Sequence, residues 1–201
     1  MDLQIIKQNL EKLEYEVNLF DNGKDCAYYL DESIDNESVG FGGSVTLDQI
    51  GLYDLLNSHN DVYQHYHVLE NTDTMALRKL ENSANIYICS INAMSKDGII
   101  INIDGIGNRL SSMLFGHSKV YLVVGRNKIC EDVESAIYRA RNIAAVKNAQ
   151  RLNIKTPCAI NGDHCYDCKS PQRICNAMLT FFRKPTHANI EILLVNEDLG
   201  Y

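Results

Sequence analysis

Short apolar runs alternate with longer amphipathic stretches along this chain, and this alternation constrains its fold more than any other feature. Three runs are almost continuously apolar: NIYICS (85–90), GIIINID (98–104) and KVYLVVG (119–125). Runs of this length and composition are typical of strands that are buried on both faces of a sheet. Because helical patterns separate them, we predict a three-layer α/β fold with a mostly parallel sheet.

The remaining elements extend this pattern over the whole chain. Further strands are expected at 15–20, 38–41, 62–66 and 190–197, and helices at about 3–13, 24–33, 46–59, 74–83 and 131–152. No repeat and no linker-like composition divides the sequence. We therefore expect one domain over residues 1–201, with a cysteine-rich segment at 157–176 inserted near its end.

The charge of the chain restricts its partners. Its 201 residues carry a net charge of -7, with an isoelectric point near 5.3. This balance argues against non-specific binding to nucleic acids or anionic membranes, which needs a basic surface. No run of about 18 apolar residues is present, and the N-terminal stretch lacks the apolar core of a signal peptide. We expect a cytoplasmic protein without a membrane span, in which cysteines stay reduced.

A glycine-containing loop after the strand at 38–41 is the first candidate for ligand binding, because ligands of open α/β sheets bind beyond the carboxyl ends of strands. Thr46 and Gln49 have the spacing of a helix capping box, and free N–H groups at a helix start attract anions. No lysine follows at the spacing of a nucleotide-binding P-loop. The alternative to an anion-binding site is an ordinary tight turn between the strand and a capped helix. The candidate ligand-binding residues here are Gly40, Gly42, Gly43, Ser44 and Thr46.

A second candidate loop follows the strand at 98–104. Arg109 lies in the first turn of the next helix, where a cation is disfavoured by the helix dipole, so a carboxylate or phosphate ligand is a better explanation for it. Asp104 fits a general base, a hydroxyl acceptor or a turn residue, and the turn role is favoured for this residue alone. Asp104 and Arg109 are the candidate catalytic residues. Further ligand-binding candidates are Ser90, Asn92, Gly105, Gly107 and Asn108, while Arg126, Asn127 and Lys128 fit either a ligand loop or a solvated turn.

Four cysteines lie close together near the C-terminal end, at Cys158, Cys165, Cys168 and Cys175. A Cys-x2-Cys pair can bind one metal from a single turn, and two further thiols complete a zinc site or a [4Fe–4S] site. The spacing matches neither a zinc ribbon nor a ferredoxin, so the metal is undecided. Reduced thiols, or a redox-active dithiol at Cys165 and Cys168, are the alternatives.

Three histidines occur in the segment HNDVYQHYH (59–67). His65 and His67 alternate and would share one face of a strand, as paired metal ligands could. The segment has no acidic partners at metal-ligand spacing. We therefore interpret it as an exposed edge strand.

Five separated blocks together resemble the lactate-utilisation (LUD) domain family, in its short, cysteine-bearing branch. They are GFGGSVTLDQIGL, SINAMSKDGIIINIDGIGNRLSSMLFG, KVYLVVGRNKI, TPCAINGDHCYDCKSPQRIC and NEDLGY, and they cover most of the chain from about residue 38 onward. The resemblance implies a fold similar to ribose-5-phosphate isomerase, glucosamine-6-phosphate deaminase and CoA transferases. In that fold a loop like 40–46 often holds a phosphate or an acyl-CoA group. The glutamate nucleophile of CoA transferases has no counterpart here.

Three functions are open at this point. The resemblance implies a lactate-utilisation-type protein that binds a small anionic metabolite, with a carboxylate or a phosphate, and relays electrons through an iron–sulfur cluster. Its partners would then be redox proteins of a lactate-oxidising complex. The second possibility is a non-catalytic binding or scaffold module held together by structural zinc. The third is an isomerase- or transferase-like enzyme that uses Asp104 as its base.

Overall fold

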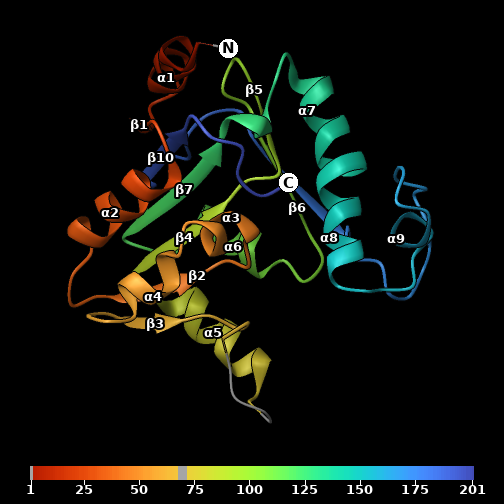
Figure 1. Ribbon diagram of the computed structural model, residues 1–201, viewed down its shortest axis with the longest axis horizontal. Helices are drawn as coiled ribbons and strands as arrows, with labels where there is room; N and C mark the ends of the chain where they lie inside the picture. Colours follow the sequence, from red (N-terminus) through yellow and green to blue (C-terminus); the bar gives the residue numbers. More distant parts are fainter. Residues whose placement is uncertain (1, 68–71) are drawn as a thin grey trace.

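The computed structural model describes residues 2–67 and 72–201, and its centre is a six-stranded sheet in the order β1-β10-β7-β4-β2-β3 (Figure 1). All of the strand pairs in this sheet are parallel. The strands are β1 (Glu16–Phe20), β2 (Ser38–Phe41), β3 (Asp61–Tyr63), β4 (Ile86–Ser90), β7 (Lys119–Gly125) and β10 (Ile190–Val195). The expected α/β class with a mostly parallel sheet is confirmed.

Apolar side chains cover both faces of this sheet. On one face, Leu122 and Ile192 pack with α1 (Leu3–Lys12) and α6 (Asn108–Leu114). On the other face, Val123 and Leu193 pack with α2 (Gly23–Ser33), α3 (Val45–Gln49) and α4 (Leu52–Leu56). Successive residues of a strand point to opposite faces, so a strand in this position must be apolar throughout. This explains the continuous apolar runs of β7 and β10.

A second, smaller sheet lies beside the first and has the order β8-β5-β6-β9. Its strands are β5 (Ala93–Ser95), β6 (Ile100–Asp104), β8 (Ile129–Cys130) and β9 (Ala177–Phe181). Strand β6 is antiparallel to both β5 and β9. Ile100 faces the main core, whereas Ile101 and Ile103 pack against alanines of the long helix. Because both faces of β6 are covered, its sequence has the same apolar character as a parallel strand.

The long helix expected at 131–152 is present, with one irregularity. It consists of α7 (Val133–Arg139), a π-helical turn η2 (Ala140–Ala144) and α8 (Ala145–Arg151), which follow one another without a break (Figure 1). Its buried face carries Ala136, Ala140 and Ala144, whose small side chains let the helix approach the second sheet. Single π-helical turns of this kind are frequent at functional sites.

Three expected elements differ in detail. The helix expected at 46–59 is divided into α3 and α4, because Gly51 between them adopts a left-handed φ of 66°. The strand expected at 62–66 ends at Tyr63, and α5 (Thr74–Ser83) follows where a helix was expected. A short helix, α9 (Pro157–Asn161), lies in the cysteine-rich segment. In the part of the chain that the structure describes, no helix is long and apolar enough to span a bilayer.

Candidate functional site

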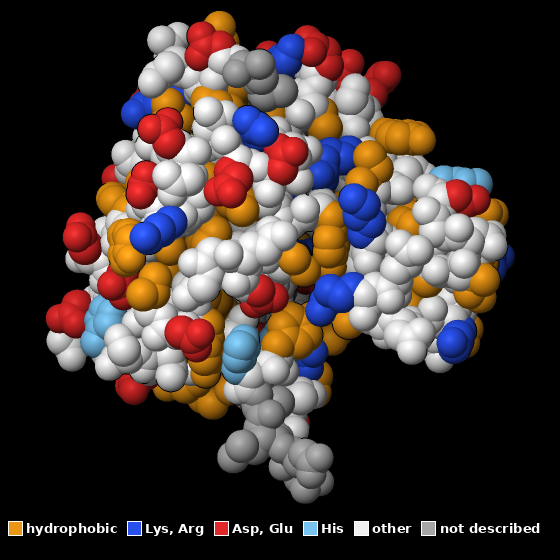
Figure 2. Space-filling model, in the orientation of Figure 1, with side chains coloured by type: hydrophobic (Ala, Val, Ile, Leu, Met, Phe, Trp, Pro, Cys, Tyr) orange, Lys and Arg blue, Asp and Glu red, His pale blue; other side chains and the backbone are white. Residues whose placement is uncertain are grey.

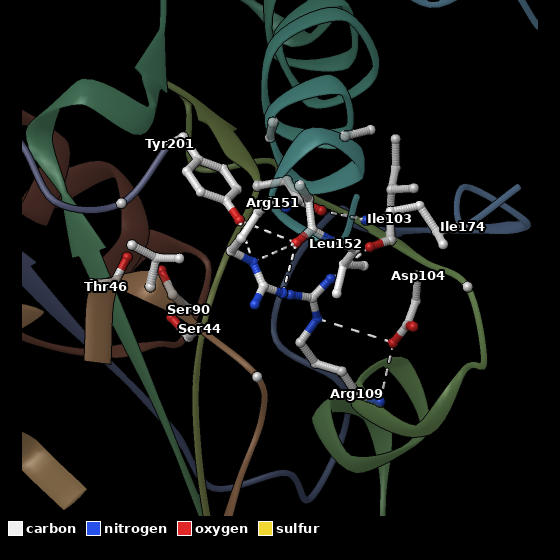
Figure 3. Close-up of a pocket in the computed structure, with 18 of the residues that line it drawn as sticks. Ser44, Thr46, Ser90, Ile103, Asp104, Arg109, Arg151, Leu152, Ile174 and Tyr201 are labelled. Carbon is white, nitrogen blue, oxygen red and sulfur yellow. Dashed lines mark hydrogen bonds and ion pairs between the residues drawn. The ribbon is translucent and has the colours of Figure 1, made fainter. Parts of the chain in front are cut away.

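A pocket of about 210 Å³ lies where the carboxyl ends of the central strands meet the long helix (Figure 3). Ser44 follows β2, Ser90 ends β4 and Lys128 follows β7. Arg151 at the end of α8 and Tyr201 after β10 close the opposite side. The pocket therefore occupies the edge of the sheet at which parallel α/β proteins bind their ligands.

Most of the residues that sequence reasoning selected come together here. Those that line the pocket are Gly43, Ser44, Thr46, Ser90, Asn92, Asp104, Gly105, Asn108 and Arg109. They come from loops that are far apart in the sequence, so the expected convergence of the strand ends is present. Whether a ligand binds there stays a prediction.

Three selected glycines lie outside this pocket. A Cβ at Gly40 would lie 2.2 Å from the carbonyl oxygen of Glu81, so this glycine lets β2 approach α5. A Cβ at Gly42 would lie 2.7 Å from both the Cys89 side chain and the Tyr87 hydroxyl. Gly107 has a φ of +95° at the residue before α6. The structure thus gives each of these glycines a backbone or packing role.

The capping arrangement in the first loop differs from the expected one. Ser44, not Thr46, is the N-cap of α3, and its side chain accepts a hydrogen bond from the N–H of Leu47. Gln49 instead accepts a hydrogen bond from the N–H of Gly200 at 2.6 Å. The expected box was wrong because Thr46 and Gln49 are used in tertiary contacts. Since α3 spans only Val45–Gln49, we assign no anion-binding role to its N-terminus.

Asp104 holds the loop that follows β6. Its Oδ1 accepts a hydrogen bond from the N–H of Ile106 at 3.2 Å, and its Oδ2 accepts one from the N–H of Arg109 at 3.1 Å. The Arg109 Nε lies 4.0 Å from the same Oδ2. Asp104 therefore positions Arg109, and this geometry agrees with the turn role that the sequence favoured.

Three arginines and one lysine line the pocket, at Arg78, Arg109, Arg151 and Lys128. Among the described lining residues, Asp104 has the only carboxylate side chain. The guanidinium groups of Arg109 and Arg151 lie close together in Figure 3. On the surface, Lys and Arg side chains line the hollow between the long helix and the main body, while Asp and Glu side chains are spread over the rest of that face (Figure 2). The pocket is thus positive in a chain whose net charge is -7.

Arg109 and Arg151 are oriented by hydrogen bonds to other residues of the chain. Arg109 donates a hydrogen bond from Nη2 to the carbonyl oxygen of Ile103 at 2.5 Å, while its Nε is buried with no hydrogen-bond partner in the described chain. Arg151 donates to the hydroxyl of Tyr201 at 2.9 Å and to the hydroxyl of Tyr66 at 3.1 Å. Neutral partners of this kind orient a guanidinium without neutralising its charge.

Lys128 is a pocket residue that the sequence does not distinguish from its loop neighbours Arg126 and Asn127. It is 3% exposed, and its Nζ donates to Thr46 Oγ1 at 2.7 Å and to Ser90 Oγ at 2.6 Å. Burial, together with the positive charges of Arg139 and Arg109, lowers the pKa of Lys128 to about 7. Its position just beyond the carboxyl end of a buried strand made this loop a candidate, but Arg126 and Asn127 share that position.

We expect Lys128 to make the stability of the protein depend on pH between about 7 and 9. An unfolded lysine keeps its proton up to about pH 10.4. The unfolded state therefore binds more protons in this range, and the free energy of unfolding should rise with pH by up to about 1.4 kcal/mol per unit. In Lys128→Met, the free energy of unfolding measured with urea should not show this rise with pH. The control Lys147→Met, at an exposed position of α8, should show the same rise as the unmodified protein. An equal dependence of the free energy of unfolding on pH in all three proteins would contradict the expectation.

His65 is a pocket residue that sequence reasoning interpreted as part of an exposed edge strand. β3 is an edge strand as expected, but the chain turns inward after it, and His65 is only 8% exposed. Its Nδ1 lies 2.7 Å from Oε1 of the fully buried Glu81, which also accepts a hydrogen bond from the His65 N–H at 2.6 Å. His67 is exposed and stacks on Tyr53. The prediction that this segment is exposed was therefore wrong for the side chain of His65.

The segment that carries the four cysteines runs along the outer side of the long helix, around α9 (Figure 1), and near its end Cys175 packs against the core between this helix and the second sheet. All four are free and partly buried, at Cys158, Cys165, Cys168 and Cys175. Within residues 2–67 and 72–201, no group of three or more His, Cys, Asp or Glu side chains has a geometry that could hold a metal ion. The arrangement described here does not fit a four-cysteine centre, and that centre stays a prediction from the sequence.

The cysteine segment nevertheless contributes to the pocket wall. Ile174, next to Cys175, lines the pocket, and a Cβ on Gly105 would lie 3.0 Å from the Ile174 carbonyl oxygen. Arg141 Nη2 donates to Cys165 Sγ at 3.8 Å, and Asn176 Nδ2 donates to the Gly105 carbonyl oxygen at 3.0 Å. The segment is thus attached to both the long helix and the loop after β6.

The fold and the site together define an α/β protein with a cation-lined pocket at the carboxyl edge of a parallel sheet. A profile of the LUD domain family matches residues 3–195, and the chain belongs to this family. Its structure is similar to that of a DUF162 family protein from Deinococcus radiodurans, with a TM-score of 0.51, 11% identity and coverage of 96% of this chain and 95% of that chain. At this identity the similarity shows the fold alone.

A weaker similarity links the chain to ribose 5-phosphate isomerase from Plasmodium falciparum. It has a TM-score of 0.32 and 19% identity, and it covers 54% of this chain and 52% of that chain. No curated protein matches the sequence.

Proposed function

We propose that this LUD-domain protein binds a small anionic metabolite, with a carboxylate or a phosphate group, in the pocket at the carboxyl edge of the sheet. The observation that carries the proposal is the meeting of Arg109 and Arg151 in a pocket whose described wall contains one carboxylate side chain. Guanidinium groups bind carboxylates and phosphates through short, charge-assisted hydrogen bonds. Asp104 does not neutralise both arginines, because it lies 4.0 Å from Arg109 Nε and forms no ion pair with Arg151 in the described chain.

The size of the pocket supports a metabolite of few carbon atoms. Its volume of about 210 Å³ is below the range of roughly 300–1,000 Å³ that is usual for drug-sized ligands. Membership of the LUD domain family supports a function of the lactate-utilisation type, and small hydroxy acids and oxo acids fit both the charge and the volume. Redox proteins of a lactate-oxidising complex are the partners that this proposal implies.

Two other possibilities carry less support. Asp104 is poorly available as a base, because both carboxylate oxygens accept backbone hydrogen bonds. An iron–sulfur or zinc site is not part of the proposal, because no group of the described side chains has a geometry that could hold a metal ion. We therefore derive no step of the function through a metal.

Isothermal titration calorimetry with the whole protein tests the proposal. Lactate, pyruvate and ribose 5-phosphate are the anionic probes, and lactamide and ribose are their uncharged counterparts. We expect at least one anion to bind, its uncharged counterpart to bind at least about tenfold more weakly, and salt to weaken the binding, since the attraction is partly electrostatic. Equal affinity for a charged probe and its uncharged counterpart, or no binding by any probe, would contradict the proposal.

A further inference from the structure

The amine of Lys128 is held in an unusual way for a buried lysine. Its Nζ donates to Thr46 Oγ1 and to Ser90 Oγ. Ser90 Oγ in turn donates its own hydrogen to the carbonyl oxygen of Val123 at 2.6 Å, so it can only accept from the lysine. The described residues provide no third hydrogen-bond partner and no carboxylate for this amine.

This arrangement matches a neutral amine better than an ammonium group. A neutral amine has two N–H groups, which the two hydroxyl oxygens satisfy, and one lone pair, which is then left without a partner. An ammonium group would have a third N–H without a partner in a buried place, which is costly. Arg109 of α6 and Arg139 of α7 also disfavour the charged form, and Cys89 of β4 is the nearby group that acts in the opposite sense.

The lone pair belongs to a residue of the anion pocket. Lys128 lines the same 210 Å³ space as Arg109 and Arg151, which are the proposed anchors of the ligand's negative group. The chain end also passes close to this amine, since a Cβ on Gly200 would lie 3.2 Å from Lys128 Nζ and 2.5 Å from Thr46 Oγ1. A small ligand held by the arginines is therefore confined together with a nucleophilic amine.

We propose that Lys128 is a nucleophile that forms a Schiff base with a small carbonyl compound bearing a carboxylate or a phosphate. The inference rests on the proposed anion binding and names the chemical class of the ligand as an anionic aldehyde or ketone. Neutral lysines desolvated near other cations are effective nucleophiles toward carbonyl groups.

The step balances without an oxidant or a reductant. The Nζ lone pair forms a bond to the carbonyl carbon, the C–O π bond breaks, and one proton moves from nitrogen to oxygen to give a carbinolamine. The second N–H proton and the hydroxyl group then leave as water, and a C–N double bond remains. Each ligand therefore loses one oxygen atom, as water, when it is attached to Lys128.

Reductive trapping tests this inference on the full-length, unmodified chain. The protein is incubated with pyruvate in one arm and with ribose 5-phosphate in another, each with cyanoborohydride, and its intact mass and peptide map are measured. In at least one arm we expect one adduct, with the mass of the ligand less one oxygen atom, on the peptide that contains Lys128. Labelling there should exceed labelling of any exposed lysine by at least about tenfold, because exposed lysines are almost fully protonated near pH 7.

Two variants locate the reaction. Lys128→Met should abolish the adduct, and Lys147→Met, at an exposed position of α8, should leave it unchanged. If Lys128→Met does not fold, the peptide map of the unmodified chain still decides the site. An adduct spread over surface lysines, or no adduct with either probe, overturns the inference.

The calorimetric titration separates this inference from the proposed function. If an anionic carbonyl compound binds but is not trapped on Lys128, the anion site stands and the nucleophile does not. If neither binding nor trapping occurs, both proposals fail. A carboxylate and a phosphate ligand are distinguished by which of the two arms gives the adduct.

Discussion

Replacing Arg109 with Met should lower the affinity of the pocket for its anionic ligand by about 100-fold or more. A hydrogen bond between a charged donor and a charged acceptor contributes about 1.5–3 kcal/mol, and a guanidinium group can form two of them with one carboxylate or phosphate. Two such bonds correspond to at least about 3 kcal/mol, which is about two orders of magnitude in the dissociation constant. Calorimetric titration of both proteins with the same ligand measures this change.

Two further substitutions show whether the effect comes from charge or from geometry. Arg109→Lys keeps the positive charge but loses the planar fork, so its affinity should fall between those of Arg109→Met and the unmodified protein. Arg126→Met makes the same change in net charge at an exposed arginine paired with Asp198, outside the pocket, and should bind normally. If Arg126→Met weakens binding as much as Arg109→Met does, long-range charge and not the pocket explains the result.

Replacing His65 with Phe should lower the free energy of unfolding by about 3–5 kcal/mol, the usual cost of removing one partner of a buried pair. Glu81 is fully buried, and its Oε1 accepts both the side-chain and the backbone hydrogen bond of His65. Its Oε2 has no hydrogen-bond partner in the described chain, so loss of the imidazole leaves a buried carboxylate with a single backbone donor. Urea unfolding followed by circular dichroism measures the change.

A second substitution distinguishes the lost partner from lost packing. In the double variant His65→Phe, Glu81→Met, both polar groups are gone, so a large part of the stability should return. His67→Phe changes an exposed histidine of the same segment and should alter the free energy of unfolding by less than about 1 kcal/mol. A double variant less stable than His65→Phe alone would show that the pair is not the cause.

The main sheet could be predicted from local patterns. Strands β4 and β7 are buried on both faces, and such a position requires apolar residues at every site along the strand. The short strand β9, at Ala177–Phe181, carries no comparable pattern, because two of its residues are exposed. Strand β6 has the pattern of a central parallel strand but is antiparallel in the second sheet. Burial on both faces produces the same apolar run in either case, so composition alone cannot assign the sheet.

The candidate site was predicted in part for a similar reason. Parallel strands bring their carboxyl ends to one edge, so the sequence alone predicts that the loops that contain Gly43, Asn92 and Arg109 meet. Arg151 lies at the end of a helix and not after a strand, and Tyr201 follows β10 in a segment that was not selected as a ligand loop. They reach the pocket because the long helix packs on the second sheet through Ala136 and Ala140, and because the chain end packs against α3, where the Gly200 N–H donates to Gln49.

Hydrophobic periodicity and turn residues were enough to establish the class of fold and the edge at which ligands are expected, because both depend on neighbours close in sequence. The chemical character of the pocket depends on contacts between distant segments. Lys128 is an unremarkable loop residue in the sequence, and burial, together with the positive charges of Arg139 and Arg109, lowers the pKa of its amine to about 7. Burial is a property of the packed molecule, and it is burial that turns this lysine into a candidate nucleophile.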